Sequence, residues 1–187
     1  MKSREINRHF QQLSNQRQAF LTYIHENVED PWQRSFPDKW SFGETTYHLM
    51  LLARLVRRVS TFYLPMMLPY AYLRKSRPFK TETHNIYKAY NQTKRKPMKA
   101  PFVLIPPANL YEKYSFQKVQ QLLEKETDKI KKQLDGMEEN IAGQIRYPDP
   151  VANYPNVIQS VHLLAIHEQH HFDLTIKYHQ QKKLENK

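Results

Sequence analysis

The sequence predicts an all-α protein, a four-helix bundle with a long crossover between its second and third helices. Two observations carry this prediction. Four long segments place apolar residues at spacings of three and four, which is the period of an amphipathic helix. Glycine is scarce, at 3 of 187 residues, and the 12 prolines fall between these segments. A chain of this length is also long enough to bury a sizeable core in one domain.

The first helix is expected at residues 4–29, where an apolar stripe persists until an Asp-Pro pair ends it. The second is expected at residues 41–63. It begins with Ser41 and Glu44, an S-x-x-E capping box in which each side chain bonds the other residue's backbone N–H. Polar groups in an apolar stripe need partners, because unpaired ones cost free energy. The predicted inward stripe of this helix comprises Glu44, His48, Leu51 or Leu52, Leu55, Val59 and Phe62.

Residues 64–113 are expected to form the crossover, and they are rich in proline, tyrosine and basic residues. Seven prolines in this segment argue against one continuous long helix. Short helical turns at residues 66–75 and 82–92 are nevertheless expected. We interpret the whole segment as a long insertion between the second and third helices of the bundle.

The third helix is expected at residues 115–141, with Gly143 as a natural stop. The fourth is expected at residues 156–180, with Asn156 as its N-cap. No sequence repeat of fixed period interrupts this order of elements. The elements together predict a single helical domain over residues 1–187.

The composition excludes several classes of function. The chain has no cysteine, which excludes disulfides, a cysteine nucleophile and thiolate metal ligands. It has no glycine-rich phosphate loop, because neither G-x-G nor G-K-[ST] occurs. The chain contains no apolar run of about 20 residues, so no membrane span is predicted. The N-terminal segment lacks the apolar run of a signal peptide. A cytoplasmic location with no membrane partner is therefore expected.

Basic residues are concentrated in one segment of the chain, whose formal net charge is +11. Residues 73–100 hold nine basic residues and one acid, interleaved with tyrosines. Such a segment is able to contact phosphates and stack on bases, so a nucleic-acid-binding or regulatory protein is one alternative. No recognised nucleic-acid-binding motif accompanies the segment, and a solvated surface is the simpler interpretation.

The segment with the clearest chemistry is residues 157–179, in which one apolar helical stripe carries both His167 and His171. At i and i+4 these imidazoles lie one turn apart, about 40° around the helix axis, so both can reach one ion. His48, on the inward stripe of the second helix, is the best placed third ligand. One inward histidine is ordinarily a hydrogen-bonded core residue. Three that converge from two helices predict a divalent-metal site with an open position for water.

The residues from His167 to His171 also spell H-E-x-x-H, the helix motif of zinc proteases. The extended form H-E-x-x-H-x-x-G-x-x-H is not met, because Leu174 and Lys177 occupy its glycine and last histidine positions. We therefore expect the third ligand upstream of the pair, and we do not adopt the protease interpretation.

Two motifs carry a family resemblance. Residues 37–49 read P-D-K-W-S-F-G-E-T-T-Y-H-L and residues 166–171 read I-H-E-Q-H-H. Together they resemble the DinB-like superfamily, which includes the bacillithiol S-transferases and is distinct from the DNA polymerase of similar name. Its members open the second helix with W-S-x-x-E-x-x-x-H-L and carry a histidine pair at i, i+4 on the fourth. The resemblance covers about residues 4–60 and 115–180.

The resemblance also has limits. Many members continue after the second histidine of the pair with R-G-Q, whereas this chain has Phe172, Asp173 and Leu174. Residues 64–113 match no motif of the family. The fold and the metal ligands therefore transfer to this chain more directly than any particular substrate does.

By resemblance, His48, His167 and His171 would be the metal ligands, while Trp40 and Ser41 would cap the second helix. The cofactor would be a divalent metal, with Zn first and Ni, Mn or Fe as alternatives. The activity would be that of a metal-dependent thiol S-transferase or a related hydrolase. Its partners would be a small-molecule thiol and an electrophilic substrate. A homodimer is one of the oligomeric states compatible with the resemblance.

Two residues beside the histidine pair are candidates for catalysis. Glu168 and His170 are placed to orient the imidazoles or to shuttle protons, and solvent-exposed polar side chains are the alternative. Glu44 is expected to act as a capping residue rather than in catalysis. A metal-binding bundle without catalysis remains a third functional alternative, beside the enzyme and the nucleic-acid-binding protein.

Overall fold

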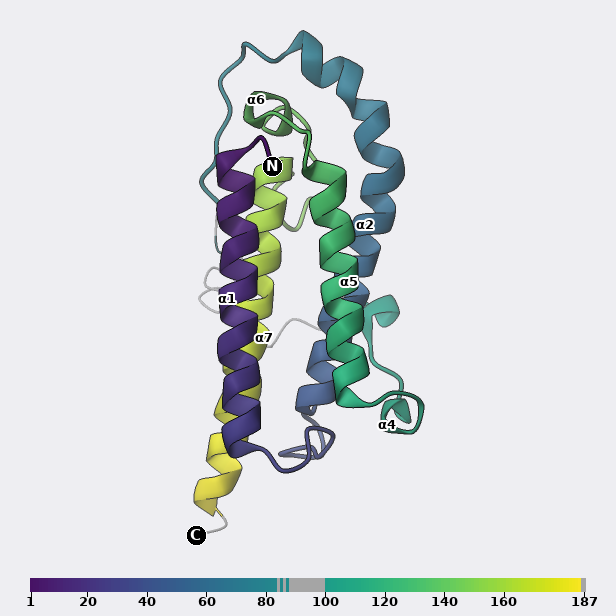
Figure 1. Cartoon of the computed structure of the whole chain (residues 1–187), viewed down its shortest axis with the longest axis vertical. Coiled ribbons are helices and arrows are strands. Elements are labelled where there is room, and N and C mark those ends of the chain that lie inside the picture. Colours follow the sequence, from purple (N-terminus) through teal and green to yellow (C-terminus); the bar gives the residue numbers. More distant parts are fainter. Residues whose placement is uncertain (84, 86, 88–99, 186–187) are drawn as a thin grey trace.

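The computed structural model describes residues 1–83, 85, 87 and 100–185. Four long helices run along the molecule (Figure 1), and the described residues contain no β-strand beyond one isolated bridge between Arg146 and Asn156. The prediction of an all-α bundle is therefore confirmed. The long helices are α1 (Arg4–Asn27), α2 (Phe42–Leu73), α5 (Phe116–Leu134) and α7 (Val157–Glu185), and the short ones are η1 (Phe102–Leu104), α4 (Leu110–Lys113) and α6 (Glu139–Ala142).

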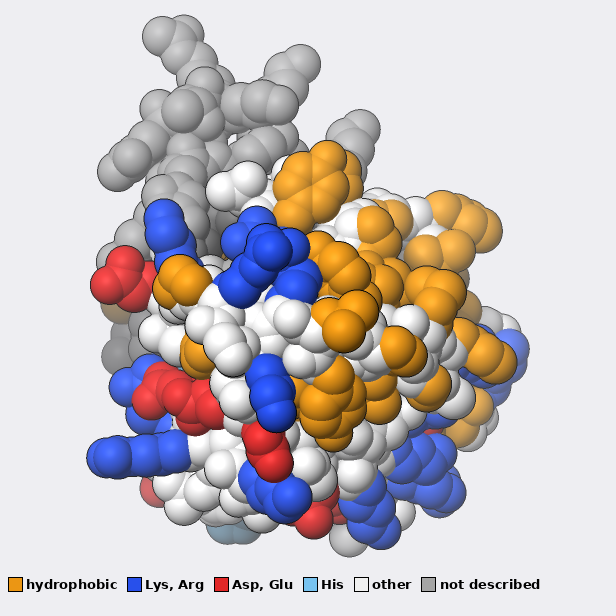
Figure 2. All heavy atoms as spheres, turned by 90° about the horizontal axis from the view of Figure 1, so that it is seen from above, with side chains coloured by type: hydrophobic (Ala, Val, Ile, Leu, Met, Phe, Trp, Pro, Cys, Tyr) orange, Lys and Arg blue, Asp and Glu red, His pale blue; other side chains and the backbone are white. Residues whose placement is uncertain are grey.

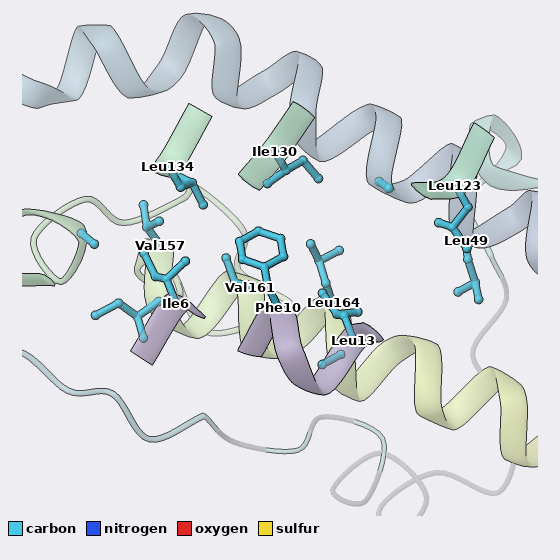
Figure 3. Close-up of a cluster of buried hydrophobic side chains, with 14 of the residues drawn as sticks. Ile6, Phe10, Leu13, Leu49, Leu123, Ile130, Leu134, Val157, Val161 and Leu164 are labelled. Carbon is cyan, nitrogen blue, oxygen red and sulfur yellow. The ribbon is translucent and has the colours of Figure 1, made fainter. Parts of the chain in front are cut away.

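The four long helices pack as two pairs, α1 with α7 and α2 with α5, around one apolar core. The amphipathic stripes of α1, α5 and α7 supply most of this core, because residues three and four apart lie on one side of a helix. α2 contributes as many core residues as α7, namely Phe42, Leu49, Met50, Ala53, Leu64 and Ala71. Figure 3 shows side chains from all four helices pointing toward one another: Ile6, Phe10, Leu13, Leu49, Leu123, Ile130, Leu134, Val157, Val161 and Leu164.

The start of α2 confirms the predicted capping box. The Glu44 N–H donates to Ser41 Oγ at 3.1 Å, and the Ser41 N–H donates to Glu44 Oε2 at 2.8 Å. The carboxylate of Glu44 also forms an ion pair with Arg34. This pairing supplies the polar partner that a buried Glu44 requires. The second helix therefore begins within a residue of its predicted position, and its first turn is fixed by side chains.

The predicted end of the second helix is wrong. α2 continues through Pro65 and Pro69 to Leu73, so residues 64–73 belong to the helix and not to the crossover. A proline inside a helix leaves the carbonyl four residues earlier without its donor. Both prolines are exposed, so water can satisfy those carbonyls. Burial of Leu64 and Ala71 on the other side of the helix favours its continuation.

The predicted inward stripe of α2 is right near its start and wrong further on. His48 is buried, but Leu55, Val59 and Phe62 are exposed. The side of this half that faces the molecule consists instead of Ala53, Ser60, Leu64 and Ala71. Both sides of α2 are apolar, and the sequence alone did not reveal which one α5 would cover.

The third helix is also shorter than the predicted 115–141. α5 ends at Leu134, and α6 follows after a short turn that contains Gly136. The N-terminal residues of the chain bind at this break: the Met1 ammonium pairs with the Asp135 carboxylate at 2.8 Å, and the Lys2 N–H donates to the Asp135 carbonyl at 3.0 Å. The carbonyl of Asp135 at the helix end thus acquires a donor from a distant part of the chain.

The crossover begins at Arg74 and returns along the N-terminal half of α7. Side-chain amides attach its backbone there: Asn156 Nδ2 donates to the Lys80 carbonyl and Gln159 Nε2 to the Glu82 carbonyl, both at 2.7 Å. The predicted turn at residues 82–92 lies largely outside the described residues. Within the described part of the chain, no helix has the length and apolar character that a membrane span requires.

Candidate metal centre

Three histidines converge where α2 lies against α7. His48 comes from the second turn of α2, and His167 and His171 come from successive turns of α7. One ring nitrogen from each lies within 4.8 Å of the others. The ring centroids are 4.5 to 5.3 Å apart. The structure therefore brings together all three residues that the sequence predicts as ligands.

The spacing of the ring nitrogens suits a metal ion. Nε2 of His48 and Nε2 of His167 are 3.1 Å apart. Two nitrogens bound to one tetrahedral Zn²⁺ at about 2.0–2.1 Å would lie about 3.4 Å from each other. The observed separation thus needs only a small adjustment for an ion to lie between the rings. The residues fit a divalent ion by donor type and by position.

In His48 and His167, Nε2 is prepared for this role by the hydrogen bond that Nδ1 makes on the opposite side of the ring. Nδ1 of His48 donates to the Leu104 carbonyl at 2.8 Å. A carbonyl only accepts, so the proton sits on Nδ1 and the lone pair on Nε2 is free. Nδ1 of His167 forms a hydrogen bond with the Tyr87 hydroxyl. Partners of this kind fix the ring orientation of metal-binding histidines.

The electrostatics of the site keep the imidazoles neutral, which is the form that binds a metal. Burial, followed by the charges of neighbouring histidines, lowers the pKa of His167 to about 3 and that of His171 to about 2. Burial also lowers the pKa of His48, against the opposing effect of the Leu104 carbonyl. The cluster is a set of lone-pair donors rather than of positive charges at neutral pH.

Aromatic residues cover the histidines. The ring of Trp40 lies 4.7 Å from that of His48 and 6.0 Å from that of His171, centroid to centroid. Trp40 is therefore part of the site as well as the residue before the helix cap. Tyr87 stacks on His170 at 4.2 Å, and burial raises the pKa of its phenol. The sequence did not single out Tyr87, because nothing distinguishes it from the other tyrosines of the crossover.

The two residues predicted for catalysis occupy different surroundings. His170 lies at the edge of the cluster, with its ring edge-on to that of His171 at 5.5 Å. Glu168 is not part of the three-histidine group. Its carboxylate instead binds the guanidinium of Arg17 from α1. His170 thus lies beside the three histidines, whereas the Glu168 carboxylate binds Arg17 on α1.

The structure describes only part of the basic 73–100 segment. Lys88, Lys94, Arg95, Lys96 and Lys99 lie outside the described residues. Arg74, Lys75, Arg77 and Lys80 are described and lie in the first part of the crossover, beyond the end of α2. The nucleic-acid alternative that was based on residues 73–100 therefore stays a prediction.

Comparison with known proteins identifies the family of the chain. The family model described as the DinB superfamily matches residues 12–174, well over half of the chain. No curated protein and no solved structure matches the chain significantly. The matched range includes both sequence motifs and all three converging histidines.

Proposed function

This chain belongs to the DinB superfamily, and from that membership we propose that it is a divalent-metal-dependent enzyme that resembles thiol S-transferases. His48, His167 and His171 hold the ion. The observation that carries the proposal is their convergence from two helices, with ring nitrogens within 4.8 Å of one another. Three neutral imidazoles leave coordination positions open, which is typical of a catalytic rather than a structural site.

The chemistry follows from the ligand set. A divalent ion held by these three histidines would supply Lewis acidity that lowers the pKa of a thiol or water toward neutrality. Tyr87 and the Leu104 carbonyl hold the rings of His167 and His48 in the orientation that exposes Nε2. Trp40 covers two of the rings and limits the access of water.

A proton must leave the thiol or the water as the nucleophile forms, and His170 is the group we assign to accept it. Its ring is in contact with those of His171 and Tyr87. The chain has no cysteine of its own, so the thiol comes from a small cosubstrate. We propose Zn²⁺ as the ion, with Ni, Mn and Fe as alternatives, and an electrophile as the second substrate. Glu168 is not assigned a step.

Metal titration tests the first half of this proposal. Protein stripped with a chelator is titrated with Zn²⁺, Ni²⁺ and Mn²⁺, and bound metal is measured by elemental analysis. We expect one equivalent per chain, and a sharp loss of affinity in His48→Ala, His167→Ala and His171→Ala. The matched control is His25→Ala, an exposed histidine of α1. One equivalent bound with unchanged affinity by the triple His→Ala variant would refute the metal site.

A conjugation assay tests the second half. The metal-loaded protein is incubated with small thiols and an activated aryl halide, and thioether formation is followed by absorbance. We expect metal-dependent conjugation that is lost in the triple variant and slowed in His170→Phe. Stoichiometric metal binding without conjugation or ester hydrolysis would favour a metal-binding bundle that has no catalytic role.

A further inference from the structure

A groove of about 330 Å³ runs between α1 and α5. The three histidines of the metal centre lie on the other two long helices, α2 and α7, and none of the described residues that line the groove belongs to that centre. Figure 1 shows α1 and α5 running antiparallel on one side of the molecule. Pockets that bind small molecules measure about 300–1,000 Å³, so the groove has room for a small ligand.

Arg17 lines the groove with one edge of its guanidinium unused. Its Nε and Nη2 bind Glu168, and Nη2 also donates to Thr127 Oγ1 at 2.8 Å. Among the described residues, Nη1 has no hydrogen-bond acceptor, and the side chain is 13% exposed. Nη1 carries two N–H donors in a rigid plane, which the other bonds hold in place. The free edge of Arg17 is therefore a fixed donor for a carboxylate group of a ligand.

Three charged side chains of α5 border the groove: Glu124, Asp128 and Lys131. All three are exposed, and within the described part of the chain none of them forms an ion pair. At separations of four and three residues, they lie on one side of the helix over about 10 Å. Viewed from the end of the molecule, hydrophobic side chains gather toward α2, whereas charged side chains of both signs lie along the opposite edge (Figure 2). The groove thus offers unpaired charges of both signs.

The remaining lining of the groove comes from α1. Phe10 and Leu13 are buried core residues at its base, and Leu21 is half-buried and packs against the same core. Ser14 and Gln18 are exposed and supply a hydroxyl and an amide, each of which both donates and accepts hydrogen bonds. An apolar base with a few polar groups around it is the usual composition of a small-molecule site.

The order of the charges selects the class of ligand. Arg17 binds Thr127, so its guanidinium lies along α5 between Glu124 and Lys131. A simple anion would be repelled by the two carboxylates, and a polyamine would be repelled by Arg17 and Lys131. Glu124 and Asp128, at i and i+4, also repel each other, and a cation beside them relieves that repulsion. A small molecule that carries one carboxylate and two cationic groups pairs every charge in the groove.

We propose that the groove between α1 and α5 binds a basic α-amino acid, of the lysine or arginine type. The carboxylate binds Nη1 of Arg17 and the Lys131 ammonium, and the α-ammonium group binds Asp128. The cationic end of the side chain binds Glu124, one helical turn or about 6 Å further along α5. The aliphatic part of the ligand lies over Leu21, as the stems of long charged side chains commonly lie on apolar surface. This site goes beyond the proposed metal chemistry and does not depend on it.

Titration of the full, Zn²⁺-loaded protein with L-lysine, followed by ¹H–¹⁵N NMR, tests the site. We expect shifts of the amide signals of residues 10–21 and 124–131, with a dissociation constant of about 0.1–1 mM for so small a ligand. Because Arg17 also stabilises the bundle, the variants are made at the exposed positions of α5. Asp128→Asn and Lys131→Ala are each expected to weaken binding about 2- to 5-fold, the effect of losing an exposed ion pair. The matched control is Lys132→Ala, an exposed neighbour outside the groove, which should bind lysine like wild type.

Analogues of lysine test each pairing in turn. Cadaverine lacks the carboxylate, Nα-acetyl-lysine lacks the α-ammonium group and norleucine lacks the cationic end of the side chain. Each is expected to bind more weakly than lysine. Cadaverine or norleucine that binds as tightly as lysine would overturn the assignment of a basic amino acid. The absence of shifts in residues 10–21 and 124–131 at lysine concentrations well above the expected range would overturn the site, as would Asp128→Asn and Lys131→Ala variants that both bind like wild type.

Discussion

Arg17 binds both carboxylate oxygens of Glu168, with Nε 2.8 Å from Oε2 and Nη2 2.5 Å from Oε1. Nη2 also donates to Thr127 Oγ1 at 2.8 Å, so one guanidinium connects α1, α5 and α7. Glu168 follows His167 directly in the sequence but points about 100° around the helix from it. The glutamate of the H-E-x-x-H motif thus stabilises the packing of these three helices.

The first prediction concerns this ion pair. Arg17→Met leaves a buried carboxylate without its cation, and we expect a loss of about 3–5 kcal/mol in the free energy of unfolding. Urea denaturation measures it. Metal stoichiometry should not change. Arg17→Met with Glu168→Met should recover part of the lost stability, because no buried charge remains. A variant that loses metal binding and keeps its stability would instead connect Glu168 to the metal centre.

The second prediction concerns the crossover. Tyr87→Phe removes the hydroxyl that binds Nδ1 of His167 and leaves the ring in place. We expect the affinity for the ion to fall about 10- to 100-fold, the usual effect of losing a partner behind a metal-binding histidine. Competition with a fluorescent chelator measures it. The matched control is Tyr111→Phe, an exposed tyrosine of α4, which should bind the metal like wild type.

The third prediction concerns acid stability. His9 is buried, neither of its ring nitrogens has a hydrogen-bond partner, and its ring stacks on that of His162 at 4.2 Å. Burial, followed by the charges of His162 and Arg8, lowers the pKa of His9 to about 4. An unfolded histidine titrates near 6.5. Between these values the unfolded chain binds the extra proton, so stability falls as the pH drops from 6.5 toward 4.

For metal-free protein, His9 should account for about 2 kcal/mol of the stability lost between pH 7 and pH 5. His9→Leu should therefore show a flatter pH profile of unfolding free energy than wild type. His25→Leu, at an exposed position of the same helix, should keep the wild-type profile. Equal profiles for all three proteins would mean that His9 gains a proton as easily in the folded state as in the unfolded state.

The fourth prediction compares two glycines. A Cβ at Gly43 would lie 2.4 Å from Cε3 of Trp32, whereas a Cβ at Gly136 would meet nothing within 4 Å. Gly43→Ala must displace the indole ring, and we expect a loss of about 1–3 kcal/mol. Gly136→Ala is expected to be neutral or to stabilise by about 0.4–1 kcal/mol. Thermal unfolding measures both, and equal melting temperatures would argue against the close packing of Trp32.

Much of the molecule could be predicted from the sequence because it depends on local spacing. The helical periodicity predicted the all-α bundle, and S-x-x-E predicted the cap of α2 at its observed position. The i, i+4 spacing placed His167 and His171 on one side of α7, and two short motifs predicted the superfamily that the family model confirms. Each of these follows from contacts between residues within one or two turns.

What the sequence left open depended on packing between distant elements. α2 is apolar on both sides, so only its contact with α5 decided that Leu64 is buried and Phe62 exposed. Exposure of Pro65 and Pro69 let the helix continue where proline alone predicted its end. Glu168 and Tyr87 acquired their partners from α1 and α7, more than 75 residues away in each case. Local spacing fixes which residues share one side of a helix, and only the burial of apolar area between helices decides which side faces the core.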